Sequence, residues 1–237
     1  MNRIVSAARL QMAHPLVSLG VPWMVVGLSF AINYAIWQLA DLGTRPDTSS
    51  NTGGIASLYI TVLVVFAQTV TQVFPFALGL SLSRRTYYLG TALAALVQSL
   101  AFGLALTVLT ALENATDGWG VGLDFWAPGA VDVGNPALQL AVFALPMLAA
   151  CFIGIGIGVV FKRWGTPGLY ALGLLTLLLG GAVAVYATWQ QTWGDIGSWL
   201  SGLSTATAAI ALPAVIALAV GALAYLCLLY TSDAADE

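Results

Sequence analysis

Four neutral amide side chains are the first candidates for chemistry in this 237-residue chain, because they lie inside long apolar runs. They are Asn33, Gln68, Gln72 and Gln98. A buried amide without a hydrogen-bond partner is costly in an apolar medium, so we expect these side chains to point into a helical bundle or across a subunit interface. Two roles fit that position. The amides could join helices by hydrogen bonds, or they could line a translocation path for an amphipathic substrate.

Residue types that perform catalysis are poorly represented. No apolar run has an ionisable residue near its centre, so the usual general acids and bases are missing, as are the charged relays of ion-coupled transport. The only lysine, Lys162, precedes Arg163, and no G-x-x-x-x-G-K-[ST] phosphate loop occurs. His14 is the only histidine, while Cys151 and Cys227 lack metal-ligand spacing. We expect no catalytic residues, no metal, no cofactor and no nucleic-acid partner.

The composition places these residues in a membrane. The chain is 59% hydrophobic and 7% charged, whereas soluble domains carry about 25% charged residues. Six apolar runs reach the roughly 20 residues that a spanning helix needs, and none alternates with the period of a strand. The runs are Leu16–Ala40, Ile55–Leu82, Tyr87–Leu112, Ala137–Phe161, Pro167–Ala187 and Ala208–Tyr230. The prediction is an all-α membrane protein with six transmembrane helices, in one domain over residues 15–230.

The basic residues predict the orientation of these spans. Of seven in all, six fall on one side of the predicted membrane and one on the other. The six are Arg3, Arg9, Arg84, Arg85, Lys162 and Arg163, and the seventh is Arg45. Short cytoplasmic loops carry the excess of Lys and Arg. Both termini are therefore expected in the cytoplasm.

Residues 1–14 predict a short amphipathic helix at the cytoplasmic membrane surface. Ile4, Ala8 and Met12 recur every fourth residue, and the two arginines lie away from them. Such a helix can lie in the interface plane and contact anionic lipid. The alternative is an unstructured basic tail.

Two further segments carry structural predictions. In Thr188–Thr207, Trp189 and Trp193 are four residues apart, and tryptophan prefers the membrane interface. This segment predicts short re-entrant helices before the sixth span, and a plain loop with an aromatic belt is the alternative. In the fourth run, Gly154 and Gly158 form a small-xxx-small pair, which predicts close packing of two helices.

The last eleven residues, Cys227–Glu237, resemble the translation of a transposon-end sequencing adapter. On that reading residues 227–237 are a non-native tail, and the natural chain departs from this sequence near Leu226. A genuine short acidic tail is the alternative. We therefore base no functional argument on this segment.

The turn between the second and third runs, SLSRRTYYLG, is the most distinctive segment of the chain. Arg84 and Arg85 should be hydrated, and Thr86 could cap the helix that follows. Tyr87 and Tyr88 would add amphipathic contact surface. A short ordered turn of this kind suits docking into a groove on a cytoplasmic partner. A loop that only sets orientation is the alternative.

The segment Phe74–Ala92, FPFALGLSLSRRTYYLGTA, resembles the permease subunits of ABC-2-type transporters. In that family a long second helix ends in such a turn, often with a basic pair and an aromatic residue. The family also has six spans, an amphipathic N-terminal helix and re-entrant helices before the sixth span. The specific likeness is confined to Phe74–Ala92, and the rest is architecture.

The resemblance implies a half-transporter in a bacterial cytoplasmic (plasma) membrane. Its partners would be a separate cytoplasmic ATP-binding cassette subunit, a second permease subunit, identical or different, and membrane lipid. The substrate would be an exported lipid, peptide or drug-like amphiphile. Two coupling elements are implied. The ATPase-coupling turn would comprise Ser83, Arg84, Arg85, Thr86, Tyr87 and Tyr88, and the connecting helix beside it would carry Arg3 and Arg9. The competing readings are a secondary transporter or channel of another family, and a membrane assembly protein without transport activity.

Overall fold

The computed structural model describes residues 3–11, 15–42, 52–204 and 207–229, and every element in these ranges is helical. Its long helices are α2 (Val21–Ala40), α3 (Ala56–Gly79), α4 (Arg84–Ala115), α5 (Pro136–Trp189) and α7 (Leu212–Leu229). Shorter elements are α1 (Arg3–Gln11), α6 (Trp193–Gly202), the π-helical turns η1 (Leu16–Gly20), η3 (Gly118–Gly122) and η5 (Thr207–Ala211), and the 3₁₀ turn η4 (Gly129–Val131). The helical part of the predicted fold class is thus confirmed.

Five helices in the described ranges are long and apolar enough to cross a membrane, where the sequence predicted six. The difference lies in α5, whose 54 residues contain both the fourth and the fifth predicted span. A helix of that length measures about 81 Å, far more than a bilayer core of about 30 Å. Gly165 interrupts it with φ 64° and ψ −155°, which only glycine adopts readily, and Pro167 follows. The helix therefore consists of a proximal segment, 136–164, and a distal segment, 166–189.

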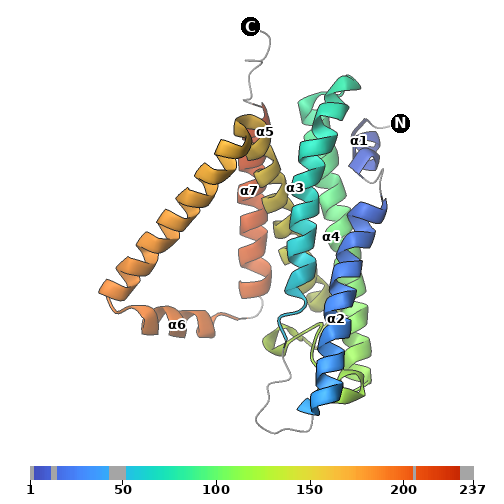
Figure 1. The fold of residues 1–237 in the computed structure, drawn as a ribbon, viewed down its shortest axis with the longest axis vertical. Helices are drawn as coiled ribbons and strands as arrows, with labels where there is room; N and C mark the ends of the chain where they lie inside the picture. The colour runs from blue at the N-terminus through green and yellow to red at the C-terminus, as the bar shows by residue number, and fades with distance from the viewer. Residues whose placement is uncertain (1–2, 12–14, 43–51, 205–206, 230–237) are drawn as a thin grey trace.

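The proximal segment packs against α3, α4 and α7, and α2 joins the bundle beside α3 (Figure 1). Two glycines bring it close to α3, as the sequence predicted. A Cβ atom on Gly154 would collide with the carbonyl oxygen of Leu63, and one on Gly158 would lie 2.7 Å from Cβ of Val70. On another face, a Cβ on Gly156 would lie 3.2 Å from Val220 of α7. Small residues thus set the spacing of three helices.

The distal segment diverges from this bundle and runs diagonally to α6, and α7 then returns beside the proximal segment (Figure 1). Its large apolar side chains are exposed; Leu178 is 66% and Val185 71% accessible. The predicted re-entrant segment contains α6, with Trp193 and Trp199 exposed. A helix before the last span is thus present.

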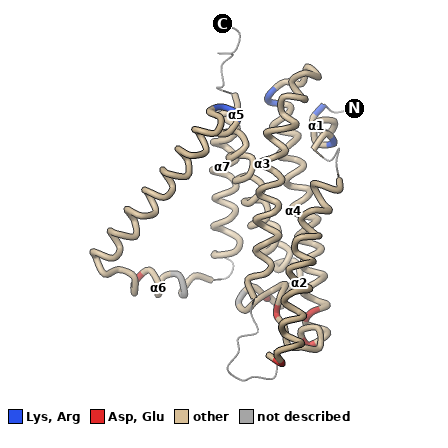
Figure 2. The backbone as a smooth tube through the Cα atoms, in the orientation of Figure 1, with Lys and Arg blue, Asp and Glu red and all other residues tan. Residues whose placement is uncertain are grey.

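The charges separate along the long axis of the bundle (Figure 2). All six basic residues in the described ranges lie at the end that carries α1, the α3–α4 turn and the bend of α5, and the acids in those ranges lie toward the opposite end. We call these the basic end and the acidic end. Arg45 and His14 fall outside the described ranges, as does the predicted tail beyond Leu229.

A buried carboxylate organises the acidic end. Glu113 is 1% exposed and accepts hydrogen bonds from the backbone N–H of Phe125 at 2.9 Å and of Trp126 at 3.1 Å. The indole Nε1 of Trp119 donates to it at 3.1 Å. The ring of Phe30 from α2 packs on all three aromatic rings at centroid distances of 5.2–5.6 Å. The loop after α4 is therefore fixed to the bundle by one anion and one aromatic cluster.

Candidate functional site

The turn at the basic end is ordered by two helix caps. Ser81 has φ 57°, its N–H donates to the carbonyl of Leu78 at 2.9 Å, and the N–H of Leu82 donates to that of Ala77 at 3.2 Å. This pair of bonds is a Schellman motif, which ends α3. Ser83 then caps α4, because its Oγ accepts from the N–H of Thr86 at 3.2 Å. The predicted cap, Thr86, is wrong: it is the third residue inside the helix.

The predicted docking residues of this turn separate into two groups. Arg84 is half-buried rather than fully hydrated, and Arg85 is exposed. Tyr87 and Tyr88 are 1% and 7% exposed, so the prediction that they form a contact surface for a partner is wrong. Both tyrosines are long side chains at the start of an apolar helix, and the bundle buries them. The exposed part of the turn is basic and hydroxylic.

The two tyrosines instead hold the turn against its neighbours. The ring of Tyr87 packs on Phe74 of α3 with centroids 5.1 Å apart. Tyr88 donates its hydroxyl hydrogen to the carbonyl of Gly221 and packs on Tyr225, both from α7. The turn therefore cannot shift without disturbing α3 and α7.

Helix α1 lies directly beside the start of α4. A Cβ atom on Gly90 would lie 2.6 Å from Cβ of Ala7, so only glycine permits this approach. Arg3 and Arg9 are exposed, as expected for the polar face of an amphipathic helix. A helix is present over Arg3–Gln11 and packs against the start of α4, and both its location at a membrane surface and its role as a connecting helix stay predictions.

The basic pair opposes the electrostatics of its own helix. Arg84 and Arg85 are the first two residues of α4, and its first turn contains no acid. The N-terminus is the positive end of the helix dipole, where a cation costs about 0.3–1 kcal/mol. The helix dipole therefore does not account for this basic pair.

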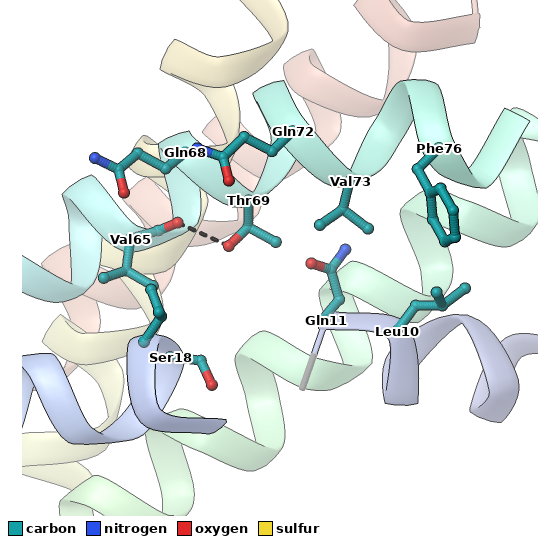
Figure 3. A pocket seen from close by; sticks show the side chains of 10 residues that line it. Leu10, Gln11, Ser18, Val65, Gln68, Thr69, Gln72, Val73 and Phe76 are labelled. Atoms are coloured by element: carbon teal, nitrogen blue, oxygen red, sulfur yellow. Dashed lines mark hydrogen bonds between the residues drawn. The ribbon is translucent and has the colours of Figure 1, made fainter. Parts of the chain in front are cut away.

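A cavity of about 420 Å³ lies between α1, η1 and α3 (Figure 3). Gln68 and Gln72 lie along its α3 wall, and Gln11 rises from α1 on the opposite wall. The remaining lining is mostly apolar. It consists of Leu10, Val17, Val65, Val73 and Phe76, with Ser18 and Thr69. The hydroxyl of Thr69 donates to the carbonyl of Val65 at 2.8 Å and is thereby satisfied within its own helix.

The four predicted amides do not form one path. Gln68 and Gln72 lie together but are exposed, so they do not point into the bundle of this chain. Gln98 is 3% exposed, and its Nε2 donates to the carbonyl of Ser18 at 3.0 Å, which joins α4 to η1. Asn33 donates to the carbonyl of Ser29 at 2.8 Å in its own helix and does not line the cavity. Gln98 thus has the bridging role, and only the first two remain candidates for contact with a substrate.

Sequence reasoning missed two residues, Gln11 and Glu113. Gln11 ends α1 and is 8% exposed, and no signal in the sequence marked its burial, because the repeat of Ile4, Ala8 and Met12 predicted a different face. Glu113 directly follows the third predicted span, Tyr87–Leu112, and was given no role from the sequence. Its place in the last turn of an apolar helix, followed by Trp119 and three glycines, was the signal for a buried anion.

No family model, curated protein or solved structure matched the chain. The likeness of Phe74–Ala92 to ABC-2-type permeases therefore stays an expectation from the sequence.

Proposed function

We propose that this chain is the permease subunit of an ABC-2-type transporter, which exports a lipid, peptide or drug-like amphiphile with ATP hydrolysed by a separate cytoplasmic subunit. The observation that supports this most is the α3–α4 turn. It is capped on both sides, it is held by Tyr87 and Tyr88, and it presents Arg84 and Arg85 against the local dipole. A rigid basic turn is suited to receive force from an acidic groove.

The proposed topology has six spans in a bacterial cytoplasmic membrane, with both termini in the cytoplasm. The proximal and distal segments of α5 would each cross the bilayer, since each exceeds roughly 20 residues. The bend between them follows Lys162 and Arg163, which the positive-inside rule assigns to the cytoplasm. In this arrangement α6 would be a re-entrant helix at the outer surface, and a second permease subunit would complete the translocation path.

The proposed mechanism needs no titratable group within the membrane. ATP binding would draw two ATPase subunits together, and the turn would transmit this motion to α3 and α4. A two-state helical bundle can be biased in this way by differential contacts alone. The cavity beside α3 would then change shape with the turn.

The test is co-expression with the ATP-binding subunit encoded beside this chain, followed by co-purification. Changing Arg84→Glu and Arg85→Glu together should release that subunit or abolish stimulation of its ATPase activity, because two attractive contacts become repulsive. The matched control is the pair Lys162→Glu and Arg163→Glu, exposed at the same end, which should retain the partner.

Two results would contradict the proposal. One is unchanged co-purification and stimulation with the Arg84 and Arg85 double variant. The other is a genome in which no Walker-motif ATPase is encoded next to this chain.

A further inference from the structure

The wall of the cavity between α1, η1 and α3 includes Gln11, whose amide oxygen is buried without an assigned hydrogen bond. The Nε2 of Gln11 donates to Oγ1 of Thr91, and that hydroxyl gives its only hydrogen to the carbonyl of Tyr87 at 3.1 Å. In this orientation the hydroxyl of Thr91 accepts from Gln11 and donates to the carbonyl of Tyr87. The Oε1 of Gln11 is buried and makes no hydrogen bond to a described residue, and the hydroxyl of Tyr87, which interacts with the Gln11 side chain, is buried in the same way. An unsatisfied buried acceptor is costly, and a donor from a ligand in the cavity would remove that cost.

The opposite wall presents two more amides to an apolar medium. Gln68 and Gln72 continue a four-residue spacing from Ile60 and Val64, which are 62% and 44% exposed, so this face of α3 is otherwise apolar. An amide facing hydrocarbon has no water to bond. A polar headgroup held between this wall and Gln11 would satisfy amides on both sides (Figure 3).

The chemistry of the lining residues indicates which kind of headgroup the cavity can bind. None of the described residues that line the cavity is ionisable, and a charged headgroup would lose its hydration there without gaining a counter-charge from them. Hydroxyl groups match better, because each one donates to an acceptor such as Oε1 of Gln11 and accepts from an amide N–H. The volume of about 420 Å³ is within the range of small-molecule sites.

We propose that this cavity binds an amphiphile whose headgroup is uncharged and bears hydroxyl groups, with its acyl chain against Val17, Val65 and Phe76. As an assignment of substrate class it rests on the proposed transport function. The binding itself requires only this chain, and it is measured without the ATPase.

The test uses the full chain in phosphatidylcholine nanodiscs, titrated with three probes that share one C18 chain and are detected by native mass spectrometry. The probes are 1-monooleoylglycerol, oleic acid and oleylamine. Monooleoylglycerol should bind about tenfold or more tightly than either charged probe. Equal affinity for all three, or preference for a charged one, would overturn the proposal.

Variants locate the binding. Changing Gln68→Leu and Gln72→Leu together should weaken monooleoylglycerol about tenfold, to the level of the charged probes. Both positions are exposed, so the fold tolerates the change. Val73→Phe, which fills the cavity, should weaken all three probes. The control Gln38→Leu, at an exposed glutamine toward the acidic end of α2, should leave every affinity unchanged. A double variant that binds like the parent chain would refute the site.

The two proposals can fail separately. In the first case monooleoylglycerol either binds without selectivity or binds equally well to every variant, while the Arg84 and Arg85 double variant still releases the ATPase. The proposed substrate class is then wrong, and the transport proposal remains. If selective binding occurs at this cavity but no ATPase associates, the chain is a lipid-binding membrane protein and the transport proposal falls.

Discussion

The proximal and distal segments of α5 are both strongly apolar, yet they differ in what touches them. Gly154 and Gly158 of the proximal segment meet α3 so closely that no side chain fits, whereas added Cβ atoms on Gly173, Gly180 and Gly181 of the distal segment would meet nothing within 4 Å. The large residues follow the same division. Met147 and Ile155 are buried, and Leu177 is 72% exposed.

This difference shows that hydropathy predicts a span but not its neighbours. In a membrane, an apolar side chain gains little by leaving lipid for protein, so close packing depends on shape. The proximal segment supplies that shape through glycines matched by Leu63 and Val70 on α3. The distal segment has glycines without a matching surface in this chain. The two segments of α5 thus contain similar types of residue, and they differ in whether another helix of this chain presents a complementary surface.

The largest expected effect compares one glycine from each segment. Gly154→Leu should prevent folding or cost at least about 3 kcal/mol, because its side chain would force α3 away from α5. Gly181→Leu should leave stability within about 0.5 kcal/mol in the isolated chain. The measurement is the yield of monodisperse protein and its thermal midpoint. Equal losses at both sites would mean that the distal segment packs as tightly as the proximal one.

The second effect compares two acids. Glu113→Ala should cost about 2 kcal/mol, because the N–H groups of Phe125 and Trp126 and the indole of Trp119 lose a shared acceptor. Asp195→Ala in α6, where the carboxylate is exposed, should cost less than about 0.5 kcal/mol. Thermal unfolding measures both, and tryptophan emission should shift to the red only for Glu113→Ala. An unshifted spectrum would show that the loop does not depend on this anion.

The smallest effect compares two serines. Ser83→Ala removes the N-cap of α4 and should cost about 1 kcal/mol. Ser198→Ala removes an exposed hydroxyl that donates to the carbonyl of Asp195 in its own helix, so its cost should be smaller than that of the cap, within about 0.5 kcal/mol. Denaturant titration resolves the two. Replacement with Ser83→Asp should preserve the cap, and failure of that variant would indicate a role for the hydroxyl other than capping.

Much of the fold could be predicted from composition and spacing. The apolar runs predicted the helices, and the one-sided basic residues predicted the separation of charge along the bundle axis. The pair Gly154 and Gly158 predicted one close contact between helices. The break in α5 was marked by Lys162, Arg163 and Pro167. The distal segment's lack of neighbours was not predictable, because nothing in an apolar run says which other surface is complementary to it.

The candidate site was predicted less well, for reasons that lie in burial. Glutamine carries no periodic signal, so Gln98 and Gln72 could not be separated until one was seen to bridge to Ser18 and the other to line a cavity. Tyr87 and Tyr88 suggested surface because tyrosine tolerates water, and the helix phase buried them. The capping role fell to Ser83 rather than Thr86 because the Schellman motif placed the first helical residue at Arg84.

The contact of Gly90 with Ala7 has a mechanical consequence. Helix α1 rests on α4 within two helical turns of Ser83, and it carries Gln11, one wall of the cavity. The other wall is α3, which enters the same turn from the opposite side. Both walls of the cavity are therefore connected to the α3–α4 turn, and we expect a tilt of this turn to change the distance between them. Because Gly90 lets α1 pack closely on α4, we expect the width of the cavity to depend on the angle of the turn.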